Sequence, residues 1–331
     1  MNYIPPVTHV PSQPSIADAL VLQSTQCRVL GSAQYADLLE GLTEDFEAGG
    51  LVFDVLGRRT ERPVHDALPL RLLGAVHRIA LSGRAPELAR CLPSCGGDGS
   101  RIDVREWLSI VAHNRAEIDR ALGEQVQTNE VGRSVVLREL ASWLPSVGVT
   151  EFDLLEIGSS AGLNLNFDRL GEMSLGAARC VERRGSDPSS LDVSRDDDAL
   201  RLQSFVWPDQ LERLDRLRRA IDVALQYPPH VEHASADEFL RTRLCHEAER
   251  STVVFHSIVW QYLPNDVRDG VRSAIDEAGS ARGSSRPVVW ARMEPSGPVA
   301  DVRVTVVDEN GRREHRLAEV GYHGQDFRWL D

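Results

Sequence analysis

The sequence predicts an α/β fold in which a helical N-terminal region precedes a mainly parallel sheet that ends in an antiparallel hairpin. Three observations support this prediction. Apolar residues recur at helical spacing up to about residue 150, short apolar runs alternate with helical patterns after it, and Asn310-Gly311 separates two final strand-like segments. The chain of 331 residues is long enough for two domains, and we expect a helical cap over 1–148 and a sheet domain over 149–331.

The elements of the cap are inferred from apolar spacing and from the glycines that end each pattern. Helical spacing predicts helices over 33–46, 68–81, 104–122 and 135–144. Gly49, Gly83 and Gly123 follow the first three, as expected for helix C-termini. One short apolar run, 51–55, is a strand candidate within this otherwise helical region.

The elements of the sheet domain alternate between strand and helix patterns. Short apolar runs bounded by turn residues predict strands over 152–157, 177–181, 230–233, 252–258 and 287–293. Helical patterns lie between them, over 163–170, 211–225, 236–244 and 266–278. This alternation predicts a parallel sheet with helices on its faces. The segments 302–307 and 312–317 flank Asn310-Gly311, which is a strong hairpin signal.

The charge balance excludes several classes of function. Asp and Glu number 50 against 37 basic residues, all of them arginine, so the formal net charge is −13. Such a chain has no surplus of cations with which to bind nucleic acid, and an anionic membrane surface repels it. The absence of lysine also excludes the P-loop and Schiff-base chemistries that need a lysine amine.

The number of cysteines and the hydropathy of the chain indicate the cellular compartment in which we expect the protein. The five cysteines, Cys245 among them, are odd in number and irregularly spaced, which predicts neither a disulfide framework nor a metal site. The first 14 residues contain four prolines and no apolar run, so we expect no signal peptide, and no stretch is apolar enough to span a membrane. We therefore expect a cytoplasmic protein without a metal.

The most informative segment is Glu156-Ile157-Gly158-Ser159-Ser160-Ala161-Gly162-Leu163-Asn164. A predicted strand meets a helix through small residues, which let a ligand approach the backbone and the N–H groups of the helix N-terminus. The segment resembles the first motif of Rossmann-like methyltransferases, in which an acid precedes glycines at alternate positions, although Ser160 replaces the central glycine. The resemblance implies a methyltransferase-type sheet and S-adenosylmethionine as cofactor, contacted by Glu156, Gly158, Ser160, Gly162 and Asn164.

The same turn fits other interpretations. Residues 158–162 satisfy the G-x-S-x-G pattern of a nucleophile elbow, with Ser160 as nucleophile and His323 downstream as the histidine of a triad. Against this hydrolase, the elbow is usually preceded by several strands, whereas here the preceding region is helical. The G-x-G-x-x-G pattern of nicotinamide enzymes is not matched. A non-catalytic binder of a nucleoside-like ligand, or a turn without any ligand, are further alternatives.

Further candidate residues follow the other predicted strands, where a nucleoside cofactor would lie across the carboxyl ends. Asp187 is expected to accept hydrogen bonds from the ribose hydroxyls, with Glu182 as the alternative. Asp237, after the third strand, is expected to accept from the adenine amine. We expect Asn129 and Arg133, between the cap and the sheet, to contact the substrate.

The candidate catalytic residues are His256 at the end of the fourth strand, Glu294 after the fifth, and His323 near the C-terminus. Tyr262, shortly after His256, is a further candidate for substrate binding. Because the carboxyl ends of parallel strands converge on one side of a sheet, we expect the three catalytic candidates to line one pocket that faces Gly158.

Six short segments, taken in order, resemble a bacterial family catalogued as a domain of unknown function. They are 129–133, 156–164, 206–210, Phe255-His256-Ser257, Met293-Glu294-Pro295 and His323-Gly324. The resemblance covers nearly the whole chain and implies a methyltransferase-like fold with a helical N-terminal part, but no assigned reaction. The expected function is S-adenosylmethionine-dependent methyl transfer to an unidentified small molecule, with the serine hydrolase and the non-catalytic binder as alternatives.

Overall fold

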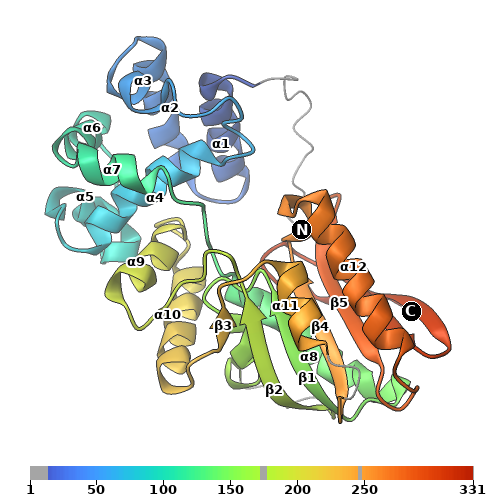
Figure 1. Cartoon of the computed structure of the whole chain (residues 1–331). Helices are drawn as coiled ribbons and strands as arrows, with labels where there is room; N and C mark the ends of the chain where they lie inside the picture. Colours follow the sequence, from blue (N-terminus) through green and yellow to red (C-terminus); the bar gives the residue numbers. More distant parts are fainter. Residues whose placement is uncertain (1–13, 172–176, 245–247, 331) are drawn as a thin grey trace. The chain divides into compact units, whose positions relative to one another are not determined.

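The computed structural model describes residues 14–171, 177–244 and 248–330, and the chain divides into two compact units (Figure 1). The first comprises Met1–Thr128 and Arg195–Asp215, and the second Asn129–Ser194 and Arg216–Asp331. The boundary that we expected after residue 148 thus follows residue 128, and a later segment joins the N-terminal helices. The expectations for the first 13 residues and for Cys245 lie outside the described residues.

The first unit is helical, as the apolar spacing predicts. Its elements are α1 (Ile16–Val29), α2 (Ala33–Glu47), α3 (Leu51–Leu56), α4 (Leu68–Leu81), α5 (Pro86–Cys91), η1 (Pro93–Cys95), α6 (Val104–His113), α7 (Arg115–Ala121) and α9 (Asp196–Ser204). Helix α1 was not predicted, although its start carries a capping box in which Ser15 and Asp18 each accept the other's backbone N–H. The helix expected over 104–122 is divided at Asn114.

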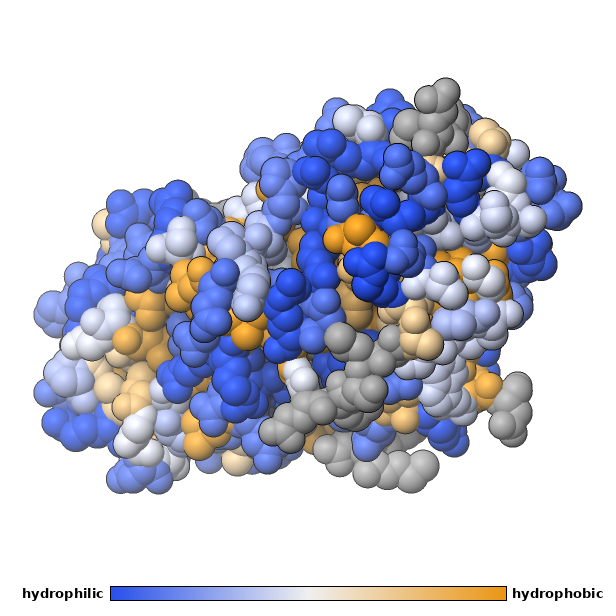
Figure 2. Space-filling view, turned by 90° about the horizontal axis from the view of Figure 1, so that it is seen from below, coloured by the Kyte–Doolittle hydropathy of each residue, from blue (hydrophilic) through white to orange (hydrophobic). Residues whose placement is uncertain are grey.

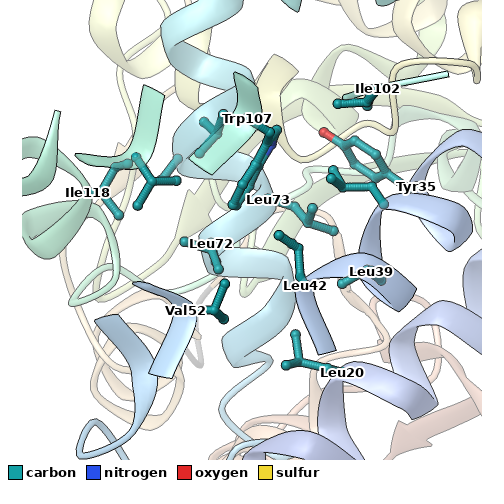
Figure 3. Packing of buried hydrophobic residues seen from close by; sticks show 14 of the residues in the cluster. Leu20, Tyr35, Leu39, Leu42, Val52, Leu72, Leu73, Ile102, Trp107 and Ile118 are labelled. Atoms are coloured by element: carbon teal, nitrogen blue, oxygen red, sulfur yellow. The ribbon is translucent and has the colours of Figure 1, made fainter. Parts of the chain in front are cut away.

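One hydrophobic cluster holds helices α1 to α7 together. Figure 3 shows Leu20 of α1, Leu42 of α2 and Trp107 of α6 pointing toward Leu72 and Leu73 of α4, and all five side chains are buried. Burying a side chain of this size contributes about 1.5–3 kcal/mol. Packing therefore stabilises these helices, several of which are too short to persist in isolation.

The segment 51–55, a strand candidate in the sequence, forms helix α3 instead. The Asp45 carboxylate accepts the N–H of Val52 at 2.7 Å and so satisfies one of the free donors at the helix N-terminus. Val52, Val55 and Leu56 all face the helical core. A short apolar run does not distinguish strand from helix, and here the neighbouring helices decide between them.

The second unit contains an eight-stranded sheet in the order β3-β2-β1-β4-β5-β6-β7-β8. Its parallel strands are β1 (Glu151–Ile157), β2 (Arg179–Ser186), β3 (Val231–Glu232), β4 (Ser251–Ser257) and β5 (Val288–Ser296). Strands β6 (Val299–Asp308), β7 (Gly311–Val320) and β8 (Arg328–Trp329) then follow as an antiparallel meander. The predicted hairpin is confirmed between β6 and β7, where Gly311 adopts a φ of +101°.

Helices cover both faces of this sheet (Figure 1). Helix α8 (Ser134–Trp143) packs in one core with Leu154 and Phe255, whereas α11 (Ala236–Arg243) and α12 (Asn265–Ser280) pack in the other with Leu155 and Trp290. Neighbouring residues of a strand point to opposite faces, so each buried strand contributes side chains to both hydrophobic cores.

The remaining elements connect the strands. They are η2 (Val131–Arg133), η3 (Leu144–Val147), η4 (Leu163–Arg169), α10 (Leu211–Gln226), which crosses the boundary between the units, and η5 (Trp260–Tyr262). The helix expected over 163–170 is the 3-10 helix η4, and it departs from helical geometry at Asn166.

Few large hydrophobic side chains are exposed in the part of the chain that the structure describes, and Figure 2 shows hydrophobic residues interspersed with hydrophilic ones on the face drawn there. In the described part of the chain, no helix is long and apolar enough to cross a membrane. The described cysteines, Cys27, Cys91, Cys95 and Cys180, are not joined in disulfides.

Candidate functional site

The turn after β1 lies where the strand order reverses. Strands β2 and β3 extend the sheet on one side of β1, and β4 and β5 extend it on the other. In open parallel sheets, ligands bind beyond the carboxyl ends of the strands at such a reversal. The segment 156–162 therefore occupies the place in the sheet where a ligand is expected.

Three residues of this turn have left-handed backbone conformations, with φ of +67° at Gly158, +56° at Ser160 and +71° at Gly162. A Cβ atom on Gly158 would lie 2.5 Å from Cγ2 of Val259, and one on Gly162 would lie 2.6 Å from Cγ2 of Val231. Glycine is thus required at both positions, because protein side chains fill the space beside them.

The backbone N–H groups of the turn are bound by the protein itself. The Ser160 N–H donates to Oδ2 of Asp187 at 3.0 Å. Oδ1 of Asn129 accepts from both Ala161 and Leu163, at 3.2 and 3.1 Å. Donors that would bind phosphate at a helix N-terminus are therefore already satisfied, which agrees with the absence of a dinucleotide motif.

Asp187 stands directly after β2, where the sequence places it. Its N–H donates to the carbonyl of Glu232 in β3, and its Oδ1 accepts the N–H of Ser189 at 2.8 Å. Together with the bond from Ser160, these contacts hold the carboxylate beside the turn. The alternative acid, Glu182, lies within β2 rather than at its carboxyl end.

Glu156, at the end of β1, is buried, and its Oε2 atom has no hydrogen-bond partner. The Oδ1 atom of Asn164 is likewise buried without a partner, while the Asn164 Nδ2 group contacts the carbonyl of Glu130 at 3.5 Å. Burial raises the pKa of Glu156 to about 8, an effect that a hydrogen bond with Asn164 partly opposes. Two buried oxygen atoms without hydrogen-bond partners thus lie next to the turn.

His323 joins this group from the segment after β7. Its Nδ1 lies 2.9 Å from Oε2 of Glu130. Arg133 donates to the carbonyls of Tyr322 and Ser257, at 3.0 and 3.2 Å, which ties the segment to the end of β4. The structure therefore gathers six of the sequence-predicted residues around the turn: Asn129, Arg133, Glu156, Asn164, Asp187 and His323.

His256 and Glu294 lie elsewhere, which corrects the expectation of one shared pocket. Glu156 pairs with Phe255 across β1 and β4, so both belong to the α8 face, and the next residue, His256, points to the α12 face. There its Nδ1 lies 2.7 Å from Oε1 of Glu294, and its ring stacks on Trp260. The carboxyl ends of the strands share one edge of the sheet, but their side chains alternate between its faces.

Asp237 and Tyr262 also fail to join the turn. Asp237 accepts from the hydroxyl of Ser235 at 2.8 Å, forms an ion pair with Arg241, and packs beside Gly270 of α12. Its contacts are therefore those of a carboxylate in the first turn of α11. Tyr262 lies in η5 with 61% of its surface exposed.

Sequence reasoning missed two residues that lie beside His256, namely Trp290 and Arg292 of β5. Strand alternation was the available signal, because residues 290, 292 and 294 share one face. Among the described residues, no three His, Cys, Asp or Glu side chains form a group that could hold a metal ion.

The fold and this turn define an α/β protein in which a helical unit accompanies a sheet with the 3-2-1-4-5 order of doubly wound folds. The chain belongs to the family described as an uncharacterized protein conserved in bacteria (DUF2332), which matches residues 17–177 and 171–329. The resemblance to a bacterial family of unknown function, drawn from the sequence, is thereby confirmed. No curated protein and no solved structure shows a significant match.

Proposed function

We propose that the turn after β1 binds S-adenosylmethionine and that the protein transfers its methyl group to a small molecule. The proposal rests on two buried oxygen atoms without partners, Oε2 of Glu156 and Oδ1 of Asn164. Buried polar atoms in folded proteins almost always have partners, so a ligand that donates hydrogen bonds fits this place. The ammonium group of the cofactor's amino acid part is such a donor.

A further carboxylate beside the turn fits the same ligand. Asp187, at the end of β2, lies beside the turn, and a carboxylate at this place suits ribose hydroxyls because it accepts hydrogen bonds. Because the backbone donors beside Asn129 are occupied, a nucleoside without phosphate suits the turn better than a dinucleotide does. When bound, S-adenosylmethionine supplies a methyl group on a sulfonium centre.

The histidine–carboxylate pair beside the turn is suited to proton transfer. With Nδ1 of His323 directed at Glu130, the Nε2 atom is left to accept a proton from the methyl acceptor. The His323 side chain is about one third exposed, which allows a substrate to reach it. Glu130 in turn accepts the N–H of Gly132, so the carboxylate that orients the imidazole is itself fixed.

The hydrolase alternative draws support from the left-handed conformation of Ser160, because the nucleophile of an elbow sits on a strained turn. Such an enzyme also needs the N–H of the residue after the nucleophile to stabilise the oxyanion. Here that donor, the Ala161 N–H, is bound to Asn129. We therefore prefer the methyltransferase.

Isothermal titration calorimetry with S-adenosylhomocysteine tests the proposal without knowledge of the methyl acceptor. We expect a dissociation constant on the order of micromolar, and a loss of at least about tenfold in the Glu156→Gln variant. Glu151→Gln, at the exposed start of the same strand, serves as the matched control and should bind like the wild type. Absence of binding by wild-type protein at millimolar ligand would refute the proposal.

A further inference from the structure

A pocket of about 430 Å³ opens on the α12 face of the sheet, the face opposite to that of Glu156. Its lining includes His256, Trp260, Arg272, Trp290, Arg292 and Glu294. The pocket therefore combines two indole rings, guanidinium groups and a histidine–carboxylate pair. Neither Glu156 nor Asp187 contributes to it, so it is separate from the turn after β1.

Three buried polar atoms on the pocket's lining residues have no hydrogen-bond partner: Nε2 of His256, Nε1 of Trp290 and Nε of Arg292. The last two always carry a hydrogen and can only donate. Leaving such groups unpaired in the interior is costly, and three unpaired atoms on neighbouring side chains are unusual. They indicate a ligand that brings acceptor atoms.

The tautomer of His256 determines what its free nitrogen can do. Oε1 of Glu294 accepts from Nδ1 of His256 and also lies 3.2 Å and 3.3 Å from the backbone N–H groups of Val259 and Trp260. An acceptor surrounded by donors requires the hydrogen on Nδ1. In the neutral imidazole, Nε2 is then an acceptor, which suits a hydroxyl group on the ligand.

The side chains that line the pocket suit a flat, negatively charged ligand. The His256 ring stacks on Trp260 with centroids 5.2 Å apart, and the Arg272 guanidinium lies 5.1 Å from the centroid of Trp260. Arg292 lies over Trp290 at 4.2 Å. Ion pairs with Asp269 and Glu314 hold these two arginines in place, so the side chains are ordered before a ligand arrives.

We propose that this pocket binds a small hydroxylated aromatic carboxylic acid. Its carboxylate accepts from the N–H groups of Arg292 and Trp290, its hydroxyl donates to Nε2 of His256, and its ring packs against the indoles. The proposal does not rest on the methyltransferase assignment, because none of the cofactor-binding candidates lines the pocket.

The test is calorimetry on the full chain without S-adenosylmethionine, with 4-hydroxybenzoate as the probe. We expect a dissociation constant below about 1 mM, weaker binding of benzoate by several-fold, and at least about tenfold weaker binding of the neutral 4-hydroxybenzamide. Inorganic phosphate should not compete, because it offers no ring. Equal binding of the acid and the amide, or no binding at all, would overturn the proposal.

Variants of the pocket residues test where on the protein 4-hydroxybenzoate binds. Arg292→Gln should weaken the binding of 4-hydroxybenzoate by about tenfold or more, whereas Arg328→Gln on β8 should leave this affinity unchanged. If Arg292→Gln fails to fold, Trp290→Phe is the second variant. It keeps an aromatic ring in the pocket wall but removes one N–H donor, so it should weaken the binding of 4-hydroxybenzoate several-fold. Glu156→Gln separates the two proposals, since it should weaken cofactor binding by at least about tenfold and leave 4-hydroxybenzoate binding unchanged. Unchanged affinity in a folded Arg292 variant and in Trp290→Phe would exclude the site.

Discussion

Glu156 and His256 lie at the carboxyl ends of adjacent strands but on opposite faces of the sheet. The register that pairs Glu156 with Phe255 produces this separation. Each residue belongs to its own polar group, with Asn164 and Asp187 on the α8 face and with Glu294 and Trp260 on the α12 face. The segment between the groups is held from both sides, since Arg133 binds the carbonyl of Ser257 and Glu294 binds the N–H of Val259.

The raised pKa of Glu156 predicts a specific pH dependence of stability. The pKa is about 8 in the folded protein and near 4.5 in the unfolded chain, so the folded state holds the proton more tightly. The resulting stabilisation is complete below pH 4.5 and is lost as the pH rises to 8. Glu156→Gln should therefore gain stability relative to the wild type by up to about 1.4 kcal/mol per pH unit across this window.

Urea denaturation between pH 5 and pH 9 measures this effect. The free energies of unfolding of Glu156→Gln and the wild type should diverge as the pH rises, whereas those of the wild type and Glu151→Gln should run parallel. Parallel curves for Glu156→Gln would show that this carboxyl is not strongly perturbed.

The contact of Gly158 with Val259 predicts a steric coupling. Gly158→Ala should lower the free energy of unfolding by roughly 2–4 kcal/mol, through backbone strain and the clash with the valine. Gly297→Ala is the control, because Gly297 has a similar φ of +69° but nothing within 4 Å of its added Cβ. Val259→Ala should partly rescue the Gly158 variant in a double-mutant cycle. Strictly additive effects would contradict the contact.

The two hydrogen bonds accepted by Asn129 predict that its amide oxygen stabilises the turn. Asn129→Ala leaves the Ala161 and Leu163 N–H groups without their acceptor and should cost about 1–3 kcal/mol in chemical denaturation. Asn129→Asp retains an acceptor oxygen and should keep most of the stability. The interpretation fails if the two variants are equally destabilised.

Ser160 distinguishes the preferred function from the hydrolase. Ser160→Gly suits the φ of +56° and should change stability by no more than about 1 kcal/mol while S-adenosylhomocysteine affinity is maintained. A fluorophosphonate probe should not label the wild-type protein. Labelling that disappears in Ser160→Gly would instead favour the hydrolase.

Much of the fold could be predicted because the signals are local. The helical patterns of α2 and α4, the strands β1, β4 and β5, and the Asn-Gly hairpin each depend on residues close together in the chain. The predictions from sequence were wrong where contacts between residues distant in the chain determine the local structure. Segment 51–55 is helical because the helical core packs against it, and 195–215 joins the first unit through contacts such as the 2.9 Å bond between His77 and the Ser204 carbonyl.

The same distinction applies to the candidate sites. The sequence by itself was enough to identify the turn after β1 and the acid after β2. A strand-to-helix turn of small residues consists of consecutive positions and can be recognised without knowledge of distant contacts. Only the tertiary structure decided that His323 joins this turn through Glu130 while His256 faces a separate pocket with Trp290 and Arg292. Strand register causes this division, because a shift of one residue would move every side chain to the other face, and register depends on pairing between strands almost 100 residues apart.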